Sequence, residues 1–266
     1  MKKLNITATI AILMISTFLF NGCEDVIDID LNQANTNIVI EAEIVNDMNR
    51  QRVTISQTKN FNDDNSIVPV TDAQITVTDE LGNKFVYNER VPGGYESGFF
   101  IGIPGRKYSM EVKSQGKTYT AFSIMPKQVI LDSITLTEIT LFNKKNKFIQ
   151  VNYVDPPDRP NFYNYKLSVN NELRNAYYVD EDRFYNGNKV TNTIFSEEPE
   201  LKTGDIVNLD FQCIDEKTYK YFYAISQIKG NGGPPTAPAN PDSNFNNGAL
   251  GYLSAHTSQK VNATIR

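Results

Sequence analysis

The sequence has no tryptophan, a single histidine (His256) and only two cysteines (Cys23 and Cys213) in 266 residues. Two cysteines cannot define a disulfide framework, so a chain of this length has to be held together by its hydrophobic core. A lone histidine argues against the catalytic zinc sites that use two or three histidine ligands. The missing tryptophan weakens the case for a platform on which a carbohydrate ring stacks.

The sequence motifs of common enzymes are missing as well. No G-x-S-x-G segment is present to place a serine nucleophile, and no Walker or dinucleotide-binding fingerprint occurs. The acidic run 28–32 begins like a calcium loop, but Gln33 and Val39 stand where that loop needs glycine and glutamate. The segments 62–65 and 180–182 carry oxygen ligands without the calcium-loop spacing. We therefore expect no catalytic residues, no metal and no cofactor.

Charge excludes further classes of function. The formal net charge is −5, and no basic patch stands out along the chain. Nucleic-acid-binding proteins carry clustered lysine and arginine, so nucleic acid is not expected as a partner. An acidic surface also argues against attachment to anionic lipid through charge alone.

What the sequence does contain is a distinctive N-terminus. Two lysines follow Met1, residues 6–20 form a nearly unbroken apolar run, and the small residue Gly22 comes directly before Cys23. This order is typical of a secretory signal, here residues 1–22. The apolar run is shorter than the roughly 20 residues that a membrane-spanning helix needs.

The cysteine at the end of this segment resembles the lipobox of bacterial lipoproteins. That resemblance implies that Cys23 carries a diacylglycerol and becomes the first residue of the mature protein. Two or more acyl chains anchor a protein stably, whereas one holds it only marginally. Two alternatives stay open: an ordinary signal peptide that leaves Cys23 free or bonded to Cys213, and an uncleaved N-terminal anchor.

Alternation of apolar and polar residues dominates the first half of the chain after an acidic tether, residues 23–33. Short alternating segments separated by turns every 8 to 12 residues predict a β-sandwich over residues 34–125. A short strand is also expected at 27–31. The other segments that we expect to form strands in this half are 38–44, 52–56, 73–79, 84–87, 108–112 and 118–122, with turns at 92–94 and 104–105.

The second half, residues 126–266, is predicted to be β-rich with one helix. Asp215 is expected to cap a helix over about 216–229, followed by a Gly/Pro-rich segment over 230–247. The stretch 175–201 is rich in tyrosine, asparagine and acid and is expected to be a long excursion between strands. Further strands are expected at 130–142, 147–154, 163–169, 206–214, 248–255 and 261–265.

The Gly/Pro-rich segment 230–247 and the aromatic residues of the excursion are the best candidates for contact with a partner or ligand. The aromatic residues are Tyr177, Tyr178, Phe184 and Tyr185. Aromatic side chains are preferred anchors at interfaces, although packing in a core is their commoner fate. Cys213 is expected to be a buried structural thiol. His256 is expected to be a surface or strand histidine.

Several segments together resemble the DUF4249 family of Bacteroidetes lipoproteins. They are 23–31, 38–42, 70–77, 94–95, 105–108, 219–222 and 244–253. The resemblance implies an outer-membrane lipoprotein, often encoded beside a TonB-dependent receptor, with an N-terminal immunoglobulin-like or carboxypeptidase-regulatory-like β-sandwich. It also implies that Glu24 and Asp25 form the signal for export to the cell exterior.

These observations predict a non-enzymatic, lipid-anchored protein of the outer membrane that serves as the accessory binding subunit of a TonB-dependent transporter, in nutrient capture or gating. A stand-alone cell-surface module that binds a glycan or a peptide is the alternative. A hydrolase that uses two carboxylates is a third hypothesis, but the 31 acidic residues of the chain give no way to choose a pair.

Overall fold

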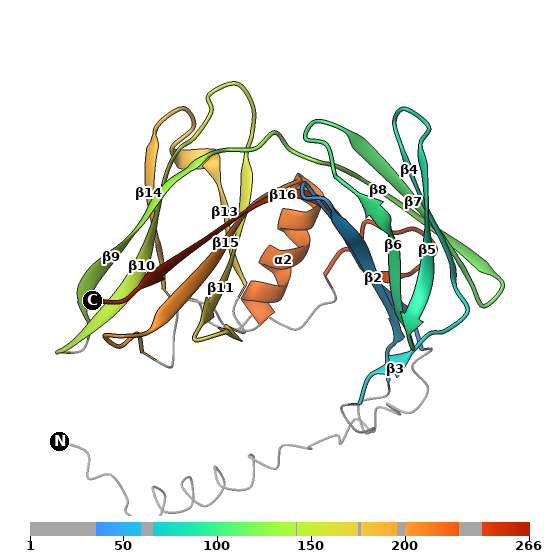
Figure 1. Ribbon diagram of the computed structural model, residues 1–266, viewed down its shortest axis with the longest axis horizontal. Helices are drawn as coiled ribbons and strands as arrows, with labels where there is room; N and C mark the ends of the chain where they lie inside the picture. The colour runs from blue at the N-terminus through green and yellow to red at the C-terminus, as the bar shows by residue number, and fades with distance from the viewer. Residues whose placement is uncertain (1–35, 60–65, 142, 175–176, 196–199, 229–240) are drawn as a thin grey trace, which may run out of the picture. The chain divides into compact units, whose positions relative to one another are not determined.

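Strands make up most of the regular structure in the computed structural model, which describes residues 36–59, 66–141, 143–174, 177–195, 200–228 and 241–266 (Figure 1). The first half contains β1 (Ile38–Val45), β2 (Asn49–Gln57), β3 (Val68–Pro69), β4 (Gln74–Asp79), β5 (Lys84–Val91), β6 (Gly94–Phe100), β7 (Lys107–Ser114) and β8 (Lys117–Ile124). The second half contains β9 (Leu131–Leu141), β10 (Lys144–Val154), β11 (Phe162–Val169), β12 (Glu172–Leu173), β13 (Tyr178–Glu181), η2 (Asp182–Phe184), β14 (Lys189–Ile194), β15 (Ile206–Ile214), α2 (Glu216–Ile228) and β16 (Leu250–Thr264). The prediction of a mainly β protein with one late helix is confirmed.

The described strands form two sheets. The larger one has 13 strands in the order β12-β11-β15-β16-β1-β2-β6-β5-β4-β7-β8, with β13 paired to β11 and β3 paired to β2. The smaller one has the order β14-β10-β9. Strands from both halves of the chain therefore belong to the larger sheet.

The first half builds a core from side chains that alternate along its strands. In β1, Ile38, Ile40, Ala42 and Ile44 are buried, and the residues between them face the opposite side of the sheet. β7 alternates between exposed and buried residues along its whole length. Because side chains of a strand point to opposite faces in turn, this alternation places one apolar face inward. This is the pattern that the sequence predicted for a β-sandwich.

The second half has a core of its own, rich in tyrosine. It lies between the small sheet and the β11-β15 part of the large sheet, and Tyr153, Tyr163, Tyr165 and Phe211 are its largest side chains. Their rings lie 4.8 to 5.7 Å apart between centroids, the separation that favours offset and tilted aromatic pairs.

The long strand β16, dark red in Figure 1, joins the two halves. Its first part pairs in parallel with β1, from Val39 opposite Leu250 to Val45 opposite His256. Its second part pairs antiparallel with β15. Gly251 has a φ of +92°, and a Cβ atom there would lie 2.1 Å from the carbonyl oxygen of Ile40, so this close approach of β16 to β1 requires glycine. A domain boundary near residue 126 stays a prediction, but β16 contributes to the cores on both sides of it.

The helix α2 begins where the sequence predicted. The Asp215 carboxylate accepts a hydrogen bond of 2.8 Å from the amide of Thr218, which is an N-cap contact. Tyr221 and Phe222 are buried, and the helix contacts β11, β13 and β16. Tyr223, on the same helix, is 47% exposed.

Three expectations about strands were wrong. The predicted strands 248–255 and 261–265 are one strand, because the polar residues 256–260 between them stay paired with β1 and β15. The excursion 175–201 contains β13 and β14, which pair with β11 and β10. Gly94, expected in a turn, is the first residue of β6. The predicted strand at 27–31 lies outside the described residues.

Among the residues that the structure describes, no helix has the length and apolar character needed to cross a bilayer.

Candidate functional site

The four aromatic residues predicted to make contacts have different environments. Tyr177 stacks on Phe222 of α2 with the ring centroids 5.5 Å apart. Tyr178 and Tyr185 are half-buried and pack against the second core. Only Phe184, in η2, stands out from the surface, with 87% of its area exposed. Phe184 is therefore the one residue of the four that is open to a partner.

The structure describes only some of the other predicted site residues. Cys23, Glu24 and Asp25 lie outside the described residues, as does most of the Gly/Pro-rich segment 230–247. The described end of that segment is tied to the fold, because the Asn244 side chain exchanges two hydrogen bonds with the backbone of Leu253. We conclude that at least this end of the segment has a structural role.

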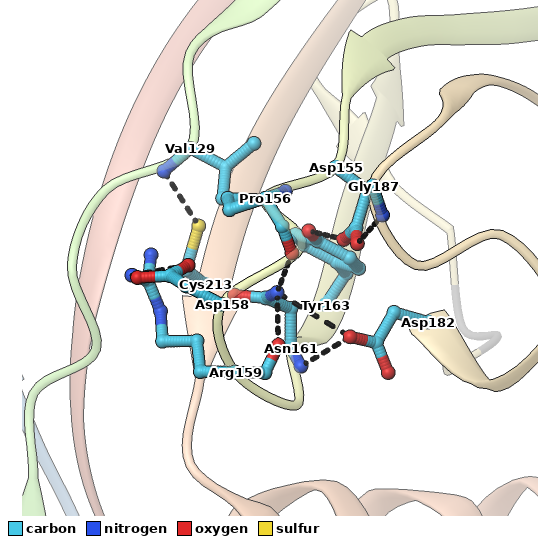
Figure 2. A network of polar contacts seen from close by, with 10 residues as sticks. All are labelled: Val129, Asp155, Pro156, Asp158, Arg159, Asn161, Tyr163, Asp182, Gly187 and Cys213. Carbon is cyan, nitrogen blue, oxygen red and sulfur yellow. Dashed lines mark hydrogen bonds and ion pairs between the residues drawn. The ribbon is translucent and has the colours of Figure 1, made fainter.

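A buried polar network fixes the loop that follows β10 (Figure 2). The Asp155 carboxylate accepts hydrogen bonds from the Tyr163 hydroxyl and, at 3.3 Å, from the amide of Gly187. The side chain is completely buried, and this burial raises the pKa of Asp155. Asp155 therefore holds the loop against β11 and the segment before β14.

Asp182 performs the same task on the other side of this loop. Its carboxylate accepts a 2.9 Å hydrogen bond from the amide of Asn161, whose side chain in turn donates to the carbonyl oxygens of Pro156 and Arg159 (Figure 2). Asp182 is only 7% exposed. A hydrolase needs its two carboxylates at the wall of a cleft, so these buried acids give the hydrolase hypothesis no support.

Cys213 lies beside the same network. It is a buried free thiol whose sulfur accepts a hydrogen bond of 3.3 Å from the amide of Val129. Burial raises its pKa, which keeps the thiol protonated and unreactive. The prediction of a buried structural thiol is therefore confirmed.

A different polar cluster opens to the surface and forms the best candidate for a binding site. It is a hollow of about 200 Å³ on the large sheet, which we call the polar hollow. Its walls come from β1, β2 and the turn between them, and from β11, β15 and β16. The lining residues are Glu43, Val45, Asp47, Asn49, Arg50, Gln51, Arg52, Lys166, Asp210, Gln212, His256, Ser258 and Lys260.

Strand register explains why these residues meet. Apolar residues of β1 point into the first core, so Glu43 lies on the opposite face, beside Ser254 of β16. Pairing of β16 with β15, and of β15 with β11, continues this polar face to Lys166 of β11. Residues directly paired across strands have their side chains on the same face. The polar hollow therefore exists only because β16 joins the two halves.

The floor of the polar hollow contains an ion pair. The Lys166 ammonium lies 2.6 Å from the Glu43 carboxylate, and each side chain is about one-third exposed. Burial alone would raise the pKa of Glu43, but the Lys166 ammonium and the hydrogen bonds to the carboxylate outweigh it, so the pKa is lowered. Glu43 is therefore charged at neutral pH.

His256 lies next to this pair and is only 2% exposed. Its Nδ1 atom and the Ser254 hydroxyl are 3.0 Å apart, within hydrogen-bonding distance. Burial lowers the pKa of His256 more than the nearby Glu43 carboxylate raises it. The ring is therefore neutral at pH 7. The expectation of a strand histidine is correct, and the alternative of a surface position is wrong.

The other polar groups of the floor are bonded to one another. The Asp210 carboxylate accepts hydrogen bonds from the Ser258 hydroxyl at 2.5 Å and from the Gln212 amide at 2.8 Å. Gln212 in turn accepts a 2.7 Å hydrogen bond from Asn164. The floor is therefore fixed before any ligand arrives.

The β1–β2 turn at the rim is held by Gln51, which is 2% exposed. Its side-chain oxygen accepts from the amide of Val45 at 2.9 Å, and its amide donates to the carbonyl of Phe100 at 2.9 Å. Beside it, the Arg50 guanidinium lies over the ring of Phe99, 4.8 Å from its centroid. These contacts hold the rim residues in place.

A second hollow, of about 240 Å³, lies near the β11–β12 hairpin and includes Asp205. The carboxylate of Asp205 is already bonded to the amide of Lys202 at 2.7 Å and to the side chain of Asn170 at 2.9 Å. The lining of this second hollow contains no histidine, and its Asp205 carboxylate is already bonded to the protein, so we place the candidate site in the polar hollow. In the described part of the chain, no group of three or more histidine, cysteine or acidic residues is arranged to hold a metal ion.

Sequence reasoning missed the polar hollow. Glu43 and Lys166 are 123 residues apart, and no local pattern links them. A partial signal was present in β1, where Glu41 and Glu43 occupy the face opposite the apolar residues. A charged outer face on a strand is usually a solvated surface, so this signal alone does not indicate a site.

A family model described as a domain of unknown function, DUF4249, matches residues 24–261. The chain belongs to the DUF4249 family. The family read from the sequence is thereby confirmed, and the matched region of this DUF4249 protein contains all of the polar hollow. A search of curated proteins found no match.

Solved structures similar to this DUF4249 protein are distant. One is a DUF4785 family protein from Legionella pneumophila, with 12% identity and a TM-score of 0.24, for which the match covers 69% of this chain and 54% of the other. This chain thus spans about half the length of that protein. Another is a two-domain fibronectin type III segment of chicken tenascin, with 11% identity, a TM-score of 0.22 and coverage of 86% and 100%. Neither carries an argument about function.

Proposed function

We propose that this DUF4249 protein is a lipoprotein anchored at the outer face of the outer membrane, where it serves as the accessory binding subunit of a TonB-dependent transporter and helps capture or gate its substrate. The polar hollow carries the binding part of this proposal, because five strands from both halves bring charged groups to one open site. Small-molecule sites use a few precisely placed polar groups to fix the orientation of a ligand, and the polar hollow supplies such groups.

The location in this proposal rests on Cys23. The residue follows an apolar segment and a small residue and is followed by Glu24 and Asp25, which suits a lipid anchor with an export signal. Replacing Cys23 with serine should release the protein from the membrane fraction. The mass of the N-terminal peptide checks the lipid directly, and an unmodified Cys23 in the membrane-bound protein would contradict the anchor.

The transporter partner is proposed because family resemblance implies a TonB-dependent receptor as a gene neighbour. Purification of the native protein from detergent extracts should recover a receptor of this class. Phe184 is the most exposed predicted contact, so Phe184→Ala should reduce the recovery. Leu81→Ala is the matched control, since Leu81 is also exposed (69%) but lies in the first half. If no receptor is recovered at any salt concentration, the proposed partner is wrong.

A stand-alone binding module is the second candidate function. It is favoured by the fact that this chain alone supplies every wall of the polar hollow. The two candidates differ in one measurement: a stand-alone module binds its ligand but brings no receptor through purification.

A further inference from the structure

The polar hollow contains two charges that the protein itself does not neutralise. Asp47 lies in the β1–β2 turn and Lys260 lies on β16. Within the described residues, neither the Asp47 carboxylate nor the Lys260 ammonium has a hydrogen-bond or ion-pair partner. Every other charged group of the lining has one. These pairs are Glu43 with Lys166, Asp210 with Ser258 and Gln212, Arg50 with the Ser97 carbonyl, and Arg52 with Glu96.

This distribution of charge limits the ligand. A phosphate group would need cations that converge without anions nearby, whereas Glu43, Asp47 and Asp210 all line the same hollow. The hydroxyl groups of a neutral sugar can hydrogen-bond to Asp47 and Lys260 but neutralise neither charge. A molecule with one ammonium and one carboxylate would pair with both of them. Charge complementarity therefore favours a zwitterion.

An apolar lip lies beside the charged rim. Met48, in the β1–β2 turn, is 64% exposed, and Phe99 of β6 is exposed to the same extent. β2 and β6 are paired here, with Arg50 opposite Phe99, so the lip continues directly from the rim of the hollow. Exposed apolar residues grouped beside a polar site are suited to contact the apolar part of a ligand. An amino-acid side chain would provide such a part.

Size narrows the class further. The polar hollow has about 200 Å³, which is less than the roughly 300–1,000 Å³ of sites for drug-sized ligands. We infer that the polar hollow binds a small zwitterion, a free amino acid or a dipeptide, with its ammonium toward Asp47 and its carboxylate toward Lys260. This inference rests on the proposed binding function and names the ligand class of that site.

Calorimetric titration of the full-length protein in detergent tests the inference. The probes are leucine, the dipeptide leucyl-leucine, its N-acetylated and its C-amidated forms, inorganic phosphate and glucose. We expect leucine or leucyl-leucine to bind, and blocking either end to weaken the binding about three- to tenfold, the scale of one partly exposed charge pair. Binding of phosphate or glucose without leucine or leucyl-leucine would overturn the inference, as would no zwitterion binding at millimolar concentration.

Two variants identify the groups involved. Asp47→Asn should weaken binding of leucyl-leucine but leave the affinity of the N-acetylated form unchanged. Lys260→Gln should weaken binding of leucyl-leucine but leave the affinity of the C-amidated form unchanged. When a substitution in the protein and a block on the ligand remove the same interaction, their effects on affinity do not add, which is the signature of a direct contact. The matched controls are Asp242→Asn and Lys189→Gln, which remove exposed charges that are not among the lining residues. If the two test variants and the two controls all bound leucyl-leucine with the same affinity, both the assigned orientation and the site would be wrong.

The failure of this inference differs from the failure of the proposed function. If a receptor co-purifies but no zwitterion binds, only the ligand class is wrong. If leucyl-leucine binds and no receptor is recovered, the ligand class holds and the partner is wrong.

Discussion

Two polar clusters in this protein use similar residues in opposite ways. In the Asp155 network, the acid is fully buried and its two recorded hydrogen bonds come from a tyrosine hydroxyl and a backbone amide of the protein itself. In the polar hollow, Glu43 and Lys166 are paired but a third exposed, and Asp47 and Lys260 are unpaired among the described residues. The first cluster is closed and the second is open.

The difference indicates which cluster can bind a ligand. A buried acid with protein donors contributes to stability, because removing it leaves those donors without partners. An open cluster contributes less to stability, because water solvates its charges in the folded and the unfolded state. Substitutions should therefore affect the two clusters unequally, and the following expectations run from the largest effect to the smallest.

The largest effect is expected for Asp155→Ala. It leaves the Tyr163 hydroxyl and the Gly187 amide unpaired in the interior, which should lower the free energy of unfolding by about 3 kcal/mol. Urea unfolding measures this change. Asp158→Ala is the control, since Asp158 lies in the same loop but its side chain is 61% exposed. If the two variants lost similar amounts of unfolding free energy, the Asp155 network would be no more stabilising than an exposed surface residue.

A smaller effect is expected for the ion pair of the polar hollow. Glu43→Gln and Lys166→Met should each lower the free energy of unfolding by about 1 kcal/mol, and the double mutant should show a coupling energy of about 0.5 kcal/mol. The exposed pair Glu111–Lys113 is the control, and its coupling should be close to zero. A coupling at Glu43–Lys166 as large as the loss in Asp155→Ala would show that the hollow is not open.

The pH dependence of stability should have opposite signs in the two clusters. Burial raises the pKa of Asp155 above 3.8. The pH-dependent contribution of this shift to the free energy of unfolding is therefore complete below pH 3.8 and is lost as the pH rises through the folded-state pKa. The pKa of Glu43 is lowered below 4.5, because the Lys166 ammonium and hydrogen bonds outweigh burial. Its contribution to the free energy of unfolding is therefore present above pH 4.5 and is lost on acidification.

Unfolding free energies measured across the acidic and neutral range test this contrast. Asp155→Asn should reduce the loss of stability on raising the pH, and Glu43→Gln should reduce the loss on lowering it. Parallel pH profiles for the two variants would contradict the assignment.

The smallest effect on stability is expected at the rim. Asp47→Asn and Lys260→Gln remove charges that have no partner in the described structure, so the unfolding midpoint should stay where it is in the unmodified protein. The same two variants are expected to change ligand binding. A clear loss of stability in either one would mean that the charge has a structural role and is not held open for a ligand.

The sequence was a good guide to the strands and a poor guide to the site. Alternation identified β1, β7 and β15 because each has one apolar face. It failed at residues 256–260, where polar residues continue β16, because pairing with distant strands keeps them extended. β14 was missed although Val190, Thr191, Thr193 and Ile194 are β-branched and favour a strand, because the tyrosine, asparagine and acidic residues around it dominated the prediction for the whole excursion.

The candidate site depends on strand order, and a single sequence does not contain that information. The parallel pairing of β16 with β1 brings His256 beside Glu43, and the pairing of β15 with β11 adds Lys166. Aromatic content alone suggested the region around Tyr177 and Tyr185, but packing with α2 and the second core accounts for both residues. Only Phe184 keeps the exposure that the prediction requires.

The position of β16 also has a consequence for how the chain folds. The contact between Asn46 and Ser258 spans 212 residues, and the parallel ladder beside it closes a loop of similar length. Doubling the length of such a loop costs only about 0.6 kcal/mol, so stability hardly suffers. The folding rate is lowered, because pairings between distant segments form slowly. The first core stays open along β1 until β16 arrives, so this edge is where a holding chaperone would protect the newly synthesised chain from aggregation.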